Sequence, residues 1–101
     1  MGLEDKIQII FNTVCYSYNV KMQAVRGKNR QANIREARQL VAYFIREYTD
    51  LSLPKVGYMI NRDHSTVIHS IKVVRDQVEF NKEYRLRHEL INEIIKTRIN
   101  G

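Results

Sequence analysis

SLPKVGYMINRDHSTVIHS, residues 52–70, is the stretch on which the rest of the chain depends. Ser52 can cap a helix by accepting a hydrogen bond from a free backbone N–H, and Pro54 falls in the first turn of that helix, where its missing N–H costs nothing. Asp63 can cap a second helix, and Gly57 would let the two helices approach closely. Two helices joined by about three or four turn residues form a helix-turn-helix, so the stretch predicts this motif.

The second helix of the motif has two different faces. Val67, Ile71, Val74 and Val78 recur at the spacing of an apolar stripe that can pack inward. The start of the helix is rich in hydrogen-bonding side chains, which are Asp63, His64, Ser65, Thr66 and, one turn later, His69. In a helix-turn-helix these N-terminal residues are the ones that can reach base edges in the major groove of DNA.

Composition places the chain among globular proteins with a polyanionic partner. Its 101 residues predict one domain, residues 1–101, and 44% hydrophobic with 28% charged residues argues against disorder. The net charge of +6 favours nucleic acid, although charge alone does not separate DNA from RNA or from an anionic membrane. Double-stranded DNA is favoured over RNA, because the deep, narrow RNA major groove does not admit a recognition helix.

Location and redox chemistry follow from what the sequence lacks. No run approaches the length of a membrane span, and the acidic start Leu3-Glu4-Asp5 does not resemble a signal peptide. We therefore expect a cytoplasmic protein with no membrane partner. Cys15 is the single cysteine, which excludes an internal disulfide, and we expect it to be buried as a small hydrophobic residue.

Helical periodicity accounts for most of the chain outside the motif. Apolar residues recur at helical spacing over Leu3–Tyr18, which predicts an amphipathic first helix. Asn33 followed by Glu36 has the pattern of a capping box and predicts a helix that begins there and runs to about Tyr48.

The C-terminal part is also predicted to be helical. The second motif helix should continue to about Glu79, and a last helix should run from about Lys82 to Arg98. We expect this last helix to bury Tyr84, Leu90, Ile91, Ile94 and Ile95. With no strand-period segment and no repeat, the predicted fold class is all-α, a compact bundle of about five helices.

Between the first two predicted helices lies a basic segment, Asn19 to Gln31, that contains Gly27 and Asn29 and no acidic residue. We expect a loop here. Such a loop is usually solvated surface, but it could also follow the phosphate backbone or insert an arginine into a minor groove.

Two strings carry a resemblance to a known family: LSLPKVG at residues 51–57 and RDHSTVIH at residues 62–69. Together with Ala37-Arg38-Gln39 and the basic loop, they resemble the C-terminal DNA-binding domain of the bacterial replication initiator DnaA. The likeness extends over roughly Leu3 to Leu90. It implies a helix-turn-helix bundle of the TrpR-like, DnaA C-terminal type that binds DnaA-box-like sites as a monomer and is associated with the nucleoid.

The resemblance also implies roles for single residues. Arg30 matches the arginine that enters the minor groove, and the major-groove positions match Asp63, His64, Ser65, Thr66 and His69. Residues that match contacts to the DNA backbone are Arg38, Gln39, Leu53, Pro54 and Lys55. We add Lys28, Lys72 and Arg62 to this group for their charge and position, with Arg62 equally suited to tying down the turn. The chemistry agrees, since a carboxylate can accept from cytosine N4 and a threonine methyl can pack on thymine.

Three features depart from the family pattern. Asn61 stands where the family has two glycines, which makes the turn one residue shorter, and Ser65 stands where threonine is common. The chain also lacks a phosphate-binding loop of the form G-x-x-x-x-G-K-[ST]. We therefore expect no nucleotide, no cofactor and no enzymatic activity, and either a stand-alone relative or the origin-binding end of an initiator.

Other interpretations stay open at this stage. His64 and His69 are five residues apart, about 140° around a helix, so they do not share a face as a zinc pair would. A helical protein-interaction module with an acidic partner is the main alternative. A helix-turn-helix regulator or transposase arm with an unrelated target site would use the same chemistry.

Overall fold

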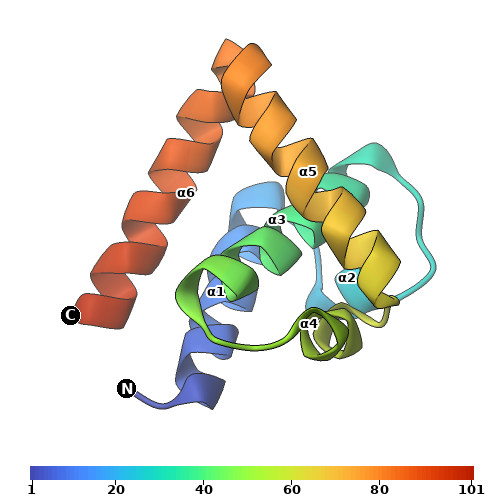
Figure 1. The fold of residues 1–101 in the computed structure, drawn as a ribbon. Coiled ribbons are helices and arrows are strands. Elements are labelled where there is room, and N and C mark those ends of the chain that lie inside the picture. The colour runs from blue at the N-terminus through green and yellow to red at the C-terminus, as the bar shows by residue number, and fades with distance from the viewer.

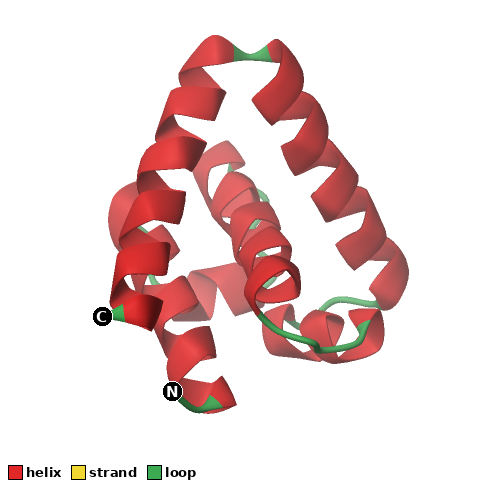
Figure 2. Ribbon diagram, turned by 60° about the vertical axis from the view of Figure 1, so that its left-hand side comes forward, coloured by secondary structure: helices red, strands yellow, loops and turns green.

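A computed structural model describes residues 1–101, and the chain is all-helical with no strand. Its helices are α1 (Leu3–Tyr18), α2 (Met22–Arg26), α3 (Ala32–Tyr48), α4 (Leu53–Ile60), α5 (His64–Phe80) and α6 (Lys82–Asn100). The two long helices α5 and α6 meet at Asn81 and form the arms of a V, as both ribbon views show (Figures 1 and 2). No helix is both long enough and apolar enough to cross a bilayer.

The core is built around α3, which packs against α1, α2, α4 and α5. Phe44, Leu40 and Ile45 of α3 are fully buried together with Ile10 of α1 and Ile60 of α4. The apolar stripes predicted for the first helix and for the second motif helix are confirmed, because their central residues lie in this core. Cys15 is buried as expected, so the sequence periodicity identified the faces that hold the bundle together.

Two of the predicted helix caps are confirmed and one is wrong. Ser52 Oγ accepts from the Lys55 N–H at 3.4 Å, and Asp63 Oδ1 accepts from the Thr66 N–H at 2.8 Å. Asn33 does not cap α3, which already begins at Ala32. The side chain of Asn29 accepts from the Gln31 N–H at 2.9 Å, and this turn starts the helix earlier than the capping-box pattern indicated.

The bundle contains six helices rather than about five. The additional helix, α2, lies inside the segment predicted to be a loop, and it buries Val25 against the core. The last helix also differs from its prediction. The predicted burial of Tyr84, Ile91 and Ile95 is confirmed, but Leu90 is 64% exposed, because His88 belongs to the buried stripe instead.

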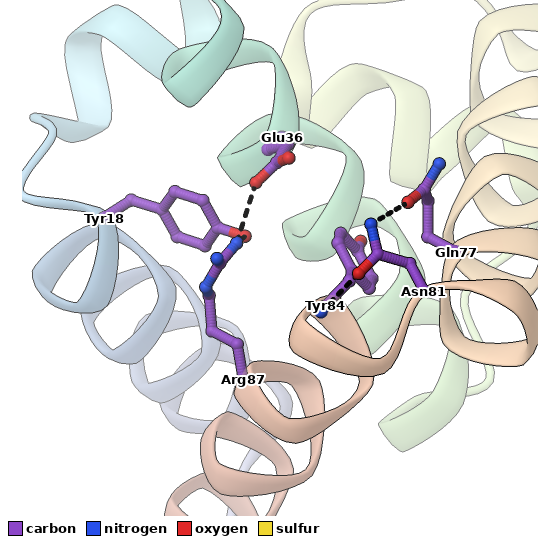
Figure 3. A network of polar contacts seen from close by, with 6 residues as sticks. All are labelled: Tyr18, Glu36, Gln77, Asn81, Tyr84 and Arg87. Carbon is purple, nitrogen blue, oxygen red and sulfur yellow. Dashed lines mark hydrogen bonds and ion pairs between the residues drawn. The ribbon is translucent and has the colours of Figure 1, made fainter.

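A small polar network joins the last helix to the rest of the bundle (Figure 3). Arg87 of α6 donates to Glu36 of α3 at 3.2 Å and to the Tyr18 hydroxyl of α1 at 3.3 Å. At the apex of the V, Asn81 Oδ1 accepts from the Tyr84 N–H at 3.0 Å and caps α6. Burial raises the pKa of Tyr18 to about 12, so this hydroxyl stays protonated and able to donate. The network fixes α6 to α1 and α3.

Candidate nucleic-acid interface

The turn between α4 and α5 is short because Asn61 adopts a left-handed conformation, with φ 58° and ψ 47°. Asparagine tolerates this region better than most residues. The next N–H, that of Arg62, donates to the Gly57 carbonyl at 2.8 Å and closes the turn. The expectation that Asn61 keeps the shortened turn tight is confirmed.

Gly57 lies where α4 comes closest to the start of α5. A Cβ atom at this position would stand 2.3 Å from the backbone oxygen of Arg62, which is too close for any side chain. The predicted structural role of Gly57 is confirmed. The angle between the two helices therefore depends on the absence of a side chain at this residue.

The N-terminus of α5 presents its polar side chains to solvent. Asp63, His64, Ser65 and His69 are exposed, whereas Thr66 is half-buried. The hydrogen bond from the backbone N–H of Thr66 holds the pKa of Asp63 below its usual value, so the carboxylate is charged at neutral pH. With Oδ1 accepting the cap bond, Oδ2 remains open to a donor such as an exocyclic amine.

Sequence reasoning missed one residue on the same helix. Ile68 is 51% exposed, one turn beyond His64, and it adds an apolar surface to an otherwise polar face. Its i, i+4 spacing from His64 was the available signal, but the residue resembles a core residue when taken alone. No three His, Cys, Asp or Glu side chains lie close enough together to hold a metal ion.

The start of α4 and the middle of α5 border a second part of this surface. Pro54 and Lys55 are exposed in the first turn of α4, and Leu53 is half-buried. Leu53 and Lys72 line one hollow together with Ile68, Ile71, Arg46, Arg75 and Asp76. The structure thus brings Leu53 and Lys72 of the predicted backbone contacts together, while Gln39 lies half-buried on α3.

The basic segment forms a separate hollow with the turn of the motif. It is lined by Lys28, Arg30, Arg35, Arg38, Asn61 and Arg62, with no acidic and no apolar residue. Lys28 and Arg30 are exposed there, as a DNA-binding arm requires. Arg35 was not predicted as part of a site, because its place within the capping-box pattern indicated only the start of a helix.

Arg38 lines the same hollow and is also bonded within the protein. Its side chain is buried and donates to the carbonyls of Val25 at 2.7 Å, Asn29 at 3.0 Å, Ala24 at 3.3 Å and Gly27 at 3.4 Å. Burial, with a smaller contribution from nearby Arg62, lowers the pKa of the guanidinium. These four bonds support the loop from below, and the contact of Arg38 to the DNA backbone stays a prediction.

Arg62 also donates to backbone carbonyls. It reaches Gly27 at 2.6 Å, Asn61 at 2.9 Å and Ile60 at 3.4 Å. The sequence left two roles open for Arg62, a contact to the DNA backbone and tying down the turn. In the structure its hydrogen bonds tie down the turn.

Comparison with known proteins gives a consistent result. The family model described as the bacterial dnaA protein helix-turn-helix matches residues 7–74. Proteins named chromosomal replication initiator protein DnaA align with 39% identity over 97% of this chain in Thermoanaerobacter sp. (strain X514) and with 37% identity over 91% in Bacteroides fragilis (strain YCH46). The protein of that name from Burkholderia multivorans is 39% identical over 83% of the chain. The chain spans about a fifth of the length of these relatives, between 16% and 21%.

Proposed function

This chain belongs to the family of bacterial DnaA helix-turn-helix domains, and on that premise we propose that it binds double-stranded DNA sequence-specifically at DnaA-box-like sites. Helix-turn-helix domains bind double-stranded DNA by placing the second helix of the motif in the major groove. Here that helix is α5, whose N-terminus carries the exposed side chains.

The observation that carries the proposal is the exposed N-terminus of α5 beside a hollow lined by cations. His64, Ser65 and His69 are free to reach base edges, and Asp63 keeps an oxygen available as an acceptor. Thr66 completes the set, with its methyl suited to thymine.

Contacts to the grooves and phosphates divide between two parts of the surface. We assign Arg30 to the minor groove next to the site, where a narrow groove attracts arginine. Lys28, Lys55 and Lys72 fix the register on phosphates, together with Gln39 and the first turn of α4 at Leu53 and Pro54. Arg62 lines the basic hollow and adds to its positive field.

The biological setting follows from the relatives. They are named chromosomal replication initiator proteins, and we propose that this chain recognises a replication origin or regulates its recognition. The chain does so as a monomer and without binding a nucleotide.

The test is fluorescence anisotropy on two short duplexes, one with a DnaA-box sequence and one scrambled, across a salt series. We expect binding to the box to be tighter by about a thousandfold, within the range for specific over non-specific sites. Equal affinities with a steep salt slope would instead indicate a non-specific backbone binder or a regulator with an unrelated target.

A second candidate function rests on a different surface. Phe80 at the end of α5 and Leu86 and Leu90 of α6 are 79%, 56% and 64% exposed. These exposed apolar side chains favour a helical protein-interaction module, and the absence of binding to either duplex would make that function the leading one.

A further inference from the structure

The turn of the motif is bonded to the basic loop by two of its own side chains. Asn61 Nδ2 donates to the Arg26 carbonyl at 3.3 Å, and Arg62 Nη2 donates to the Gly27 carbonyl at 2.6 Å. Both acceptors lie at the end of α2, immediately before Lys28 and Arg30. The recognition helix and the loop are 35 residues apart in sequence, and these two bonds join them directly, in addition to the buried Arg38 and the packing of Val25 of α2 in the core.

We propose that Arg62 and Asn61 are positioning residues, which hold the basic loop at a fixed place beside α5 so that Arg30 meets the minor groove while α5 occupies the major groove. The inference rests on the proposed function and adds to it a device that couples the two grooves. Neither side chain needs to touch a base for this role.

Electrostatic repulsion is the force that such a device would oppose. Five cations line the hollow and no carboxylate lies among them. Their mutual repulsion favours separation of the loop from the motif, because like charges at short range disfavour each other. Hydrogen bonds from Arg62 and Asn61 to carbonyls oppose this repulsion while leaving the positive field intact. A loop that is already ordered also loses less conformational freedom when DNA binds.

The chain offers matched control residues for both positions. Asn19 is the only other non-glycine residue with positive φ, at 53°, and its side chain makes no hydrogen bond, so Asn19→Gly controls for Asn61→Gly. Arg35 lines the same hollow without a hydrogen bond to a carbonyl, so Arg35→Lys controls for Arg62→Lys. The lysine keeps the charge and removes the planar fork.

The first experiment measures backbone ¹⁵N order parameters of the free protein. We expect Lys28 to Arg30 to fall from rigid values near 0.85 to below about 0.6 in Arg62→Lys and Asn61→Gly. Order in Arg35→Lys and Asn19→Gly should match the parent protein. Thermal unfolding followed by circular dichroism verifies that each variant is folded. Unchanged order in Arg62→Lys and Asn61→Gly would overturn the inference.

The second experiment measures DNA affinity in a double-mutant cycle with Arg30→Ala. Replacing the A·T pairs of the flanking minor groove by G·C pairs should lower the DNA affinity of the parent protein roughly tenfold, and Arg30→Ala should remove that preference. Arg62→Lys should remove this preference as well, and adding Arg30→Ala to Arg62→Lys should lower the affinity by less than about a further twofold. Discrimination by α5 in the major groove should be retained in Arg62→Lys. Asn19→Gly should bind as the parent protein does. Additive effects of the two substitutions would refute a positioning role. If neither the parent protein nor any variant binds one duplex more tightly than another, the proposed function fails. The order parameters would then still decide whether Arg62 and Asn61 fix the loop.

Discussion

At the scale of single residues, His64 and Lys55 lie on neighbouring helices of the candidate interface and should affect DNA binding in different ways. His64 is exposed at the start of α5, where it can reach a base edge, whereas Lys55 is exposed in the first turn of α4. We expect His64→Ala to cost about 1–3 kcal/mol of discrimination between the box and a sequence altered at one base pair.

Lys55→Ala is the matched comparison. A lysine that contacts phosphate lowers the affinity for all sequences alike and reduces the salt slope by about 1. Anisotropy titrations of both variants on matched and altered duplexes measure these quantities. Loss of specificity in Lys55→Ala with non-specific binding intact would show that the roles have been assigned the wrong way round.

His88 is the residue whose ionisation should affect folding. It is buried, its ring stacks on Phe44 with centroids 5.0 Å apart, and its Nδ1 has no hydrogen-bond partner. Burial lowers the pKa of His88, while Glu89 and Glu47 oppose the shift weakly. The imidazole is therefore held neutral against Phe44, which is the side of the core that α6 covers.

The sign of the pH dependence follows from that lowered pKa. In the unfolded chain histidine takes up a proton near pH 6.5, before the folded protein does, so stability is complete above that pH and is lost as the pH falls below it. The loss is at most about 1.4 kcal/mol per pH unit. We expect urea unfolding between pH 7.5 and 5 to show this loss in the parent protein and in His69→Gln, and a smaller loss in His88→Phe. An equal loss in His88→Phe would mean that other groups cause it.

At the scale of elements, the approach of α4 to α5 gives a direct test of packing. Gly57→Ala places a methyl group 2.3 Å from the Arg62 carbonyl oxygen, and the backbone must shift to relieve the contact. We expect a loss of about 1–3 kcal/mol in the free energy of unfolding, although alanine is the better helix former by about 1 kcal/mol. Urea denaturation measures it.

Gly2→Ala is the control for this substitution. A Cβ atom at Gly2 would meet only the Asp5 carboxylate at 3.7 Å, an ordinary contact, so its unfolding midpoint should remain close to that of the parent. If Gly57→Ala had the same urea unfolding midpoint as Gly2→Ala, the two motif helices could move apart at no cost in stability, and the packing argument would be wrong.

Elements with a long apolar stripe could be predicted from the sequence. Leu3–Tyr18 was predicted with both ends correct, and the caps at Ser52 and Asp63 were correct because these side chains act on their own neighbours in sequence. The five-residue α2 could not be found, because one turn of helix is too short to show periodicity and depends on tertiary contacts.

Two differences in side-chain burial have the same origin. Arg38 resembled a surface cation, since nothing local to it reveals that four carbonyls from the preceding segment surround its guanidinium. Leu90 resembled a core residue, but His88 takes its place in the buried stripe of α6. Both outcomes depend on which distant segment packs against the helix, and a single sequence does not contain that information.

At the scale of the whole molecule, the net charge of +6 should make DNA binding strongly dependent on salt. Lys28, Arg30, Lys55 and Lys72 are exposed on the proposed interface. If Lys28, Lys55 and Lys72 each neutralise one phosphate while Arg30 lies in the minor groove, the logarithm of the binding constant should fall with the logarithm of salt concentration with a slope of about −2.7. Anisotropy between 50 and 300 mM salt, roughly the range in which such slopes are resolved, measures it.

The test variant has Lys28 and Lys55 both changed to Gln. Its control has Lys82 and Lys96 of α6 both changed to Gln, which lowers the net charge by the same amount. These residues lie outside the proposed interface, so the slope should be unchanged. The salt slope should become shallower when Lys28 and Lys55 are changed. If it became equally shallow when Lys82 and Lys96 are changed, overall charge rather than the proposed contacts would determine binding.

The Gly27 carbonyl accepts hydrogen bonds from two arginines that belong to different parts of the fold, Arg38 of α3 and Arg62 of the turn. Because every acceptor in residues 24–29 is a backbone carbonyl, the side chains of the loop can change in evolution without loss of these bonds, whereas a change at Arg38 or Arg62 removes a donor. A chimera that receives the basic loop of another family member should therefore keep the loop in place, provided that Arg38 and Arg62 are retained.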